Sequence, residues 1–191
     1  LVQDARIIGD LVRESELSVA YSKAAAACKT EFRGETCNFY GLLKHMESTD
    51  RAERREAFEK WAALYADASA ELDAIYDELV AVRAAMAEKL GFESYTALAY
   101  RNRQRLDYTP EHVEKFREQV RTVVTPAVAR MFEAQAKRLG VDKLRYYDES
   151  LVFPGGNAHP IGGKDDMLRA AAEMYGALSP ETKEFFDFMT E

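Results

Sequence analysis

The chain has 191 residues, of which 47% are hydrophobic and 31% charged, so it can bury the core of one domain or of two small ones. Its formal net charge of -7 argues against a general nucleic-acid or anionic-membrane binder, because no excess of Lys and Arg is available to meet phosphates. No apolar run approaches the roughly 20 residues of a membrane span, and the first residues do not form a signal peptide. We therefore expect a cytoplasmic protein without nucleic-acid or membrane partners.

The first 48 residues predict two short helices, over 16–27 and 39–47, with a β-hairpin between them over 28–38. In the register that places Thr30 opposite Cys37, the cysteines Cys28 and Cys37 are diagonal neighbours about 7 Å apart, which is poorly suited to a disulfide. We expect both thiols to be free. Two cysteines alone cannot form a structural zinc site.

A long helical region follows, from near residue 50 to residue 90. Its clearest part is the apolar stripe on residues 71–90, formed by Leu72, Ile75, Tyr76, Leu79, Val82, Met86 and Leu90. Gly91 is a suitable C-terminal stop. Since 40 residues is long for one helix, "ADAS" at 66–69 is a candidate break or bend.

The remaining pattern is also mostly helical. Short helices are predicted over 93–102 and 165–177, and Thr109 and Gly140 bound a second long one. At Pro126 this helix either kinks or gives way to a new helix capped by Thr125. Residues 144–162 predict a strand or an extended loop. A last helix begins after Ser179 and runs to the end of the chain without a stop signal.

The residue types predict no active site within this sequence. His45, His112 and His159 have no second histidine three or four positions away, and His45 and His112 are expected on helix surfaces. No nucleophile elbow or phosphate-binding loop is present. The charged run "DRAERREAFEK" predicts a solvated helix face, and the pairs Tyr146-Tyr147 and Phe185-Phe186 predict core anchors. We therefore assign no catalytic, metal-binding or substrate-binding residue.

Four stretches of the sequence resemble the oligoendopeptidase F family of zinc metallopeptidases, relatives of thimet oligopeptidase. They are "CKTEFRGETCNFYGLLKHMESTDRAERREAFEKWAALYADASAELDAIYDELVAVRAAMAEKLGFESYTALAYRN", "DYTPEHVEKFREQV", "LRYYDESLVFPGGNAHP" and "LSPETKEFFDFMTE". Together they cover essentially the whole chain in the family's order. The resemblance implies a mainly α, elongated multi-helix array, part of a two-lobed neurolysin-like zincin, with one β-hairpin near 28–38 and an extended segment near 144–162.

The resemblance also implies chemistry that this sequence does not carry. In the family, zinc is held by the two His of H-E-x-x-H and a later Glu, and the Glu of the motif activates a water that attacks the bonds of short peptides. No H-E-x-x-H occurs in residues 1–191. The family pattern places residues 1–48 at the end of an N-terminal lobe and 49–191 in the first part of the catalytic domain. The resemblance also allows the loop around Gly155–His159 to approach the cleft, but we assign no site to it.

We therefore expect an internal fragment of a zinc oligoendopeptidase that is inactive alone and binds no catalytic zinc. Its C-terminal aromatic face, with Phe185, Phe186 and Phe188, is expected to be covered by a partner or by self-association. The alternative is a non-enzymatic, all-helical protein-interaction module, supported by the lack of a visible site. An H-E-x-x-H in the coding sequence after residue 191 would distinguish the two hypotheses.

Overall fold

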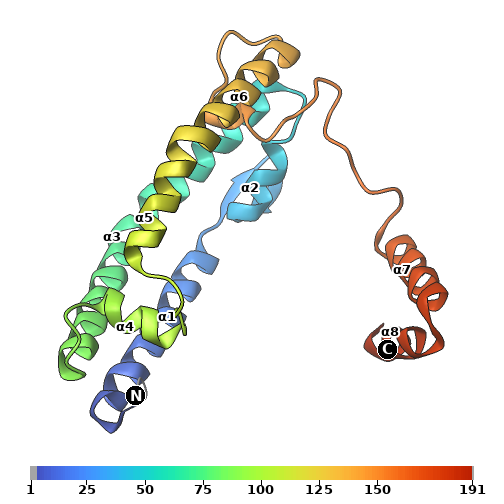
Figure 1. The fold of residues 1–191 in the computed structure, drawn as a ribbon. Helices are drawn as coiled ribbons and strands as arrows, with labels where there is room; N and C mark the ends of the chain where they lie inside the picture. Colours follow the sequence, from blue (N-terminus) through green and yellow to red (C-terminus); the bar gives the residue numbers. More distant parts are fainter. Residues whose placement is uncertain (1–3, 191) are drawn as a thin grey trace. The chain divides into compact units, whose positions relative to one another are not determined.

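The computed structural model describes residues 4–190, and it confirms a mainly α fold with one two-stranded antiparallel sheet (Figure 1). The chain divides into two units, Leu1–Gly156 and Asn157–Glu191. Every helix in the described part is too short or too polar to span a membrane.

The first unit is built on α3 (Arg51–Lys89), a helix of 39 residues and about 58 Å. It begins where Asp50 Oδ1 accepts a hydrogen bond from the backbone N–H of Ala52 at 2.9 Å. The predicted break at 66–69 is wrong. The segment is rich in alanine, which favours helix, and the Ser69 hydroxyl donates back to the Ala66 carbonyl at 2.9 Å without interrupting the helix.

Helix α1 (Ile8–Ala27) lies antiparallel along α3 and begins eight residues earlier than predicted, directly after the 3₁₀ turn η1 (Ala5–Ile7). The antiparallel order follows from the ion pairs Asp10–Lys89 (2.6 Å), Arg13–Glu78 (2.6 Å) and Glu14–Arg83 (2.7 Å). Such solvated pairs contribute at most about 1 kcal/mol each. Apolar burial is therefore the main stabilising contribution, with Leu17 buried on α1 and Leu72 and Leu79 buried on α3.

Two hydrophobic clusters form around α3. The first joins it to the hairpin and α2 (Phe39–His45) and contains the buried residues Phe32, Cys37, Leu42, Met46, Ala57 and Leu64. The second joins it to η1 and α4 (Tyr95–Asn102) and contains Ile7, Met86, Ala87 and Leu98. The long helix thus organises two separate cores.

The hairpin forms in the predicted register, with β1 (Thr30–Phe32) antiparallel to β2 (Glu35–Cys37) and Thr30 opposite Cys37. Its two turn residues, Arg33 and Gly34, both have positive φ, 52° and 84°. That conformation matches the twist of a two-residue hairpin. Both cysteines are free, as expected.

The second long helical region passes through Pro126 without a new cap. Helix α5 (Pro110–Gln119) continues through a π-helical turn, η2 (Val120–Val124), into α6 (Thr125–Leu139). The N–H of Thr125 donates to the carbonyl of Val120, five residues back, and the wider turn accommodates a proline that has no N–H of its own. Gly140 ends α6 in the left-handed conformation with φ 69°, as predicted.

The second unit pairs α7 (Lys164–Leu178) with α8 (Pro180–Thr190). Ser179 caps α8 as predicted, since its hydroxyl accepts a hydrogen bond from the N–H of Thr182 at 3.2 Å. Phe186 is buried and stacks on Tyr175 with ring centroids 4.8 Å apart. Phe185 and Phe188 are exposed, so only one of the three phenylalanines is covered by its own chain.

Candidate functional site

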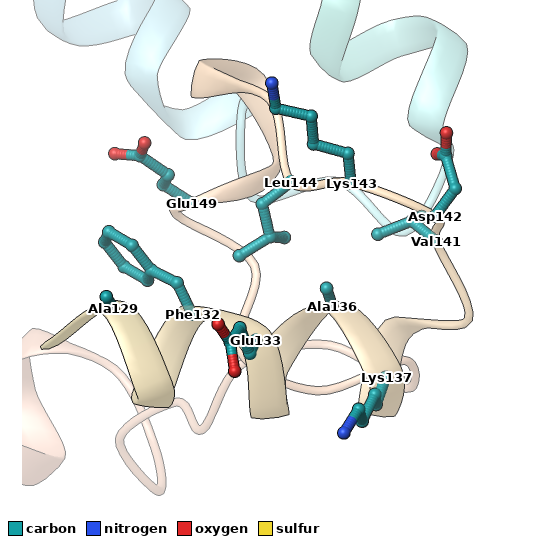
Figure 2. A pocket seen from close by; sticks show the side chains of 10 residues that line it. All are labelled: Ala129, Phe132, Glu133, Ala136, Lys137, Val141, Asp142, Lys143, Leu144 and Glu149. Carbon is teal, nitrogen blue, oxygen red and sulfur yellow. The ribbon is translucent and has the colours of Figure 1, made fainter. Parts of the chain in front are cut away.

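An open groove lies between α6 and the loop that follows it, within the first unit (Figure 2). Its volume is about 470 Å³. The helix contributes Ala129, Phe132, Glu133, Ala136 and Lys137, and the loop contributes Val141, Asp142, Lys143, Leu144 and Glu149. Figure 2 shows Leu144 pointing from the loop toward α6, while Lys143 points away. The groove combines an apolar interior with charged groups of both signs.

The loop is held to α6 by side-chain bonds to its backbone. Gln135, which is buried, donates from Nε2 to the carbonyls of Leu151 (2.7 Å) and Glu149 (3.1 Å). Arg138 Nε donates to the carbonyl of Val152 at 2.7 Å. These bonds occupy carbonyls that a strand would offer to a neighbouring strand. Among the described residues of 144–162 there is no strand, so the loop alternative is confirmed, with a single 3₁₀ turn, η3 (Tyr146–Asp148).

A buried ion cluster braces the other side of this loop against the start of α3. Asp148 is fully buried, and its two carboxylate oxygens accept from Arg54 Nη2 at 2.7 Å and from Arg51 Nη2 at 2.8 Å. The backbone N–H of Arg145 donates to the same carboxylate at 3.0 Å. Burial by itself raises the pKa of Asp148, but the hydrogen bonds from the two guanidiniums and the backbone N–H outweigh it, and the pKa is lowered.

Arg54 is buried as deeply as its partner, with 3% of its side chain exposed. Besides Asp148, it donates from Nη1 to the carbonyl of Ser48 (2.8 Å) and from Nε to that of Tyr147 (3.1 Å). Arg51 is less buried, with 40% of its side chain exposed. Its guanidinium carbon also lies over the Tyr147 ring, 5.6 Å from the ring centroid. The cluster therefore ties three segments together: the end of the 46–50 loop, the first turn of α3 and η3.

The prediction that "DRAERREAFEK" is a solvated face is wrong for Arg54. The spacing of the sequence indicates a buried position for Arg54, because residues 54, 57, 61 and 64 lie on one face of the helix and Ala57 and Leu64 are core residues. Asp148 gave no comparable signal, since it lies in a loop. The prediction of two core tyrosines is also wrong for Tyr146, which is 74% exposed, whereas Tyr147 is partly buried.

None of the three histidines lines the groove. His112 is exposed and accepts the N–H of Thr109 on Nδ1 at 3.1 Å, so it supports the start of α5. His159 is exposed and belongs to the second unit. His45 is not a plain surface residue as expected: it is partly buried, and Nδ1 lies 2.7 Å from Glu53 Oε1. The hydrogen bond from His45 is the largest cause that lowers the pKa of Glu53.

The groove lining includes no cysteine, serine, threonine or histidine, and it pairs no nucleophile with a base. Its chemistry is that of a binding or packing surface. Within residues 4–190, one group of metal-ligating side chains comes together, namely Glu35, Cys37 and His45 with donor atoms within 4.8 Å of one another. It lies between the hairpin and α2, away from the groove lining.

Comparison with known proteins identifies the family of the chain. The sequence profile of peptidase family M3 matches residues 44–152, more than half of the chain. No curated protein matched. Three solved structures cover 99% of the chain. A protein assigned as oligoendopeptidase F from Bacillus anthracis str. Ames has 39% identity and a TM-score of 0.90. A second oligoendopeptidase F has 41% identity and a TM-score of 0.92. An inhibitor-bound Pz peptidase A has 40% identity and a TM-score of 0.92.

The alignment covers 35%, 34% and 34% of those three chains, so residues 1–191 correspond to about a third of each relative. The profile match begins at the end of α2 and ends just after η3. It therefore contains both the ion cluster and the groove. With a matching profile over more than half of its length and three relatives near 40% identity, the chain belongs to peptidase family M3.

Proposed function

We propose that this chain is part of a zinc-dependent oligoendopeptidase that hydrolyses internal bonds of short peptides in the cytoplasm. The observation that carries the proposal is the agreement over 99% of the chain with structures of the oligoendopeptidase type, at 39–41% identity and TM-scores of 0.90–0.92. Identity at this level along the whole chain supports a shared activity, and not only a shared fold.

Zinc bound in such an enzyme polarises the peptide carbonyl and supplies an activated water. The side chains of residues 1–191 do not fit that site. The sequence has three histidines, none at the spacing of H-E-x-x-H. The Glu35, Cys37 and His45 group lies between the hairpin and α2 and offers one histidine instead of a helical pair. We therefore assign no catalytic step to these residues.

In this proposal, the chain contributes architecture. Residues 1–48 form the end of an N-terminal lobe, and residues 49–191 form the first part of the catalytic domain, whose helices wall the substrate cleft. The support is the braced frame of α1, α3 and η3, in which Asp148 and Arg54 fix a loop against a long helix. A wall braced in this way would keep the shape of the cleft fixed.

The exposed apolar residues are consistent with a wall that meets other parts of the enzyme. Phe116 and Met131 on the α5–η2–α6 helix are 63% and 68% exposed, and Phe188 on α8 is 77% exposed. When residues 1–191 are isolated, we expect the α8 face to drive self-association, because exposed aromatic surface associates in water. The proposal includes no nucleic-acid or membrane partner.

The test compares two proteins on the same internally quenched fluorogenic peptide. The product of the complete coding sequence that contains residues 1–191 should cleave it, lose activity on chelation and regain it with added zinc. Residues 1–191 alone should be inactive. A folded, zinc-loaded complete protein that leaves a panel of short peptides intact would contradict the proposed activity. Zinc-dependent cleavage by residues 1–191 alone would contradict the architectural role.

A further inference from the structure

From the geometry between the hairpin and α2, we infer that Glu35, Cys37 and His45 form a zinc site separate from peptide cleavage. Their donor atoms lie within 4.8 Å of one another. A tetrahedral zinc with bonds of about 2.0–2.3 Å needs its ligands about 3.5 Å apart, so side-chain adjustments of about 1 Å close the site. Thiolate, imidazole and carboxylate together are a ligand set that suits zinc, with a water as the fourth ligand.

The hairpin places two of the ligands on one face. Glu35 and Cys37 are two residues apart on β2, so their side chains point the same way. The residue between them, Thr36, points to the opposite face, where its hydroxyl donates to Glu31 at 2.6 Å. The Cys37 sulfur is buried and faces Gly41 of α2, where a Cβ added to the glycine would lie only 3.3 Å from the sulfur. The glycine therefore leaves room at the sulfur.

The third ligand is oriented by a carboxylate. The His45 ring lies edge-on to Phe32, with centroids 4.8 Å apart, and Phe32 is the residue opposite Glu35 in the sheet. The Glu53 carboxylate accepts hydrogen bonds from His45 Nδ1 (2.7 Å) and from the Ser48 hydroxyl (2.9 Å). Because an ionised carboxylate only accepts, Nδ1 carries the proton and Nε2 is the nitrogen left to bind a metal. Carboxylate–histidine pairs of this kind orient histidine ligands in zinc sites.

The site is also reachable from solvent. Glu35 is exposed, and a hollow of about 360 Å³ is bordered by Glu35, Cys37 and Gly41, with Lys29 and Lys44 also among its lining residues. Two of the three proposed ligands, Glu35 and Cys37, therefore border a solvent-filled hollow. On binding, the Cys37 thiol loses its proton to the buffer and the thiolate bonds to zinc, with no redox change. Since the ligands connect β2 to α2, the bound ion would have a structural role: it would stabilise the hairpin and take no part in catalysis.

The chain supplies matched controls for the test. Tag-free residues 1–191 are stripped with chelator, kept reduced, and titrated with Zn²⁺ in competition with a chromophoric chelator. We expect one zinc per chain. Cys37→Ser and His45→Gln should weaken binding at least tenfold, and Glu53→Gln should weaken it about tenfold as an orienting residue. Cys28→Ser and His112→Gln remove the same residue types elsewhere and should leave affinity unchanged.

Cobalt provides a spectroscopic readout that can be taken on the unmutated chain as well as on the variants. Co²⁺ bound to the unmutated chain should show a thiolate-to-metal charge-transfer band, which persists in Cys28→Ser and disappears in Cys37→Ser. Circular dichroism of each variant checks its helix content. The inference is overturned if the unmutated chain retains no zinc in the competition, if bound cobalt lacks the charge-transfer band, or if Cys28→Ser removes binding as Cys37→Ser does. None of these outcomes depends on peptidase activity.

Discussion

Replacing Asp148 by Asn should destabilise the protein strongly, because it removes the charge that faces two guanidiniums while keeping the side-chain shape. Arg54 is 3% exposed and would keep its charge without a counter-ion. Breaking a buried pair by removing one partner costs about 3–5 kcal/mol. For a domain of this size, that corresponds to a fall in melting temperature of at least about 6 °C. Urea unfolding followed by circular dichroism gives the free energy directly.

Two further variants separate the buried pair from its exposed neighbour. Arg51 is 40% exposed, so Arg51→Gln should cost at most about 1 kcal/mol, in line with a solvated pair. The double variant Arg54→Met with Asp148→Leu should be more stable than Asp148→Asn, because apolar replacement of both charges leaves no charge buried alone. If Asp148→Asn unfolds within about 0.5 kcal/mol of the unmutated chain, the account of the cluster is wrong.

The same cluster gives a pH dependence with a defined sign. The pKa of Asp148 is lowered below its ordinary value of 3.8 in the folded protein. Its contribution is therefore fully present above that value and is lost as the pH falls through the folded pKa. Stability of the unmutated chain should drop below about pH 4 more steeply than that of Asp148→Asn. Parallel acid-dependence curves for the two proteins would count against the assignment.

Two other predictions concern the groove loop and the second unit. Gln135→Ala should cost about 1–3 kcal/mol, because the carbonyls of Leu151 and Glu149 lose a buried donor, and limited proteolysis should then cut the 144–156 loop faster. Unchanged proteolysis would mean that other contacts hold the loop. Phe186→Ala should uncouple α7 from α8 by removing the stack on Tyr175, seen as faster hydrogen exchange in α8. Phe188→Ala changes an exposed position, so it should leave hydrogen exchange in α8 unchanged and reduce the self-association seen by sedimentation. Faster exchange in Phe188→Ala but not in Phe186→Ala, with self-association reduced only in Phe186→Ala, would refute both roles.

The sequence predicted the elements whose signals are local. The hairpin register followed from a two-residue turn and from alternation, and the ends of α3, α5–α6 and α8 followed from Asp50, Thr109, Gly140 and Ser179. The path at Pro126 could not be chosen locally, because a proline is compatible with either a recapped helix or a widened turn.

The candidate site depended on long-range contacts that no local pattern contains. Asp148 and Arg54 are 94 positions apart in the sequence. A charged residue is ordinarily predicted to lie at the solvent-exposed surface, so neither residue alone indicates a buried pair. Gln135 looks like an ordinary polar helix residue until its loop folds back on it. The sequence predicts a surface position for His45 because nothing in its own helix indicates that Glu53 and Phe32 surround it.

The π turn at Val120–Val124 sets which side of α6 meets the loop. One extra residue in a turn rotates everything after it by about 100° relative to an uninterrupted α-helix. Val123 in the turn and Met131 after it are 66% and 68% exposed, whereas Phe132 lines the groove and Gln135 is buried. If the same residues formed an uninterrupted α-helix, Met131 would take the angular position that Phe132 now has, and Gln135 would turn away from the loop. The length of this single turn, more than the identity of any side chain in it, decides which residues of α6 the groove can use.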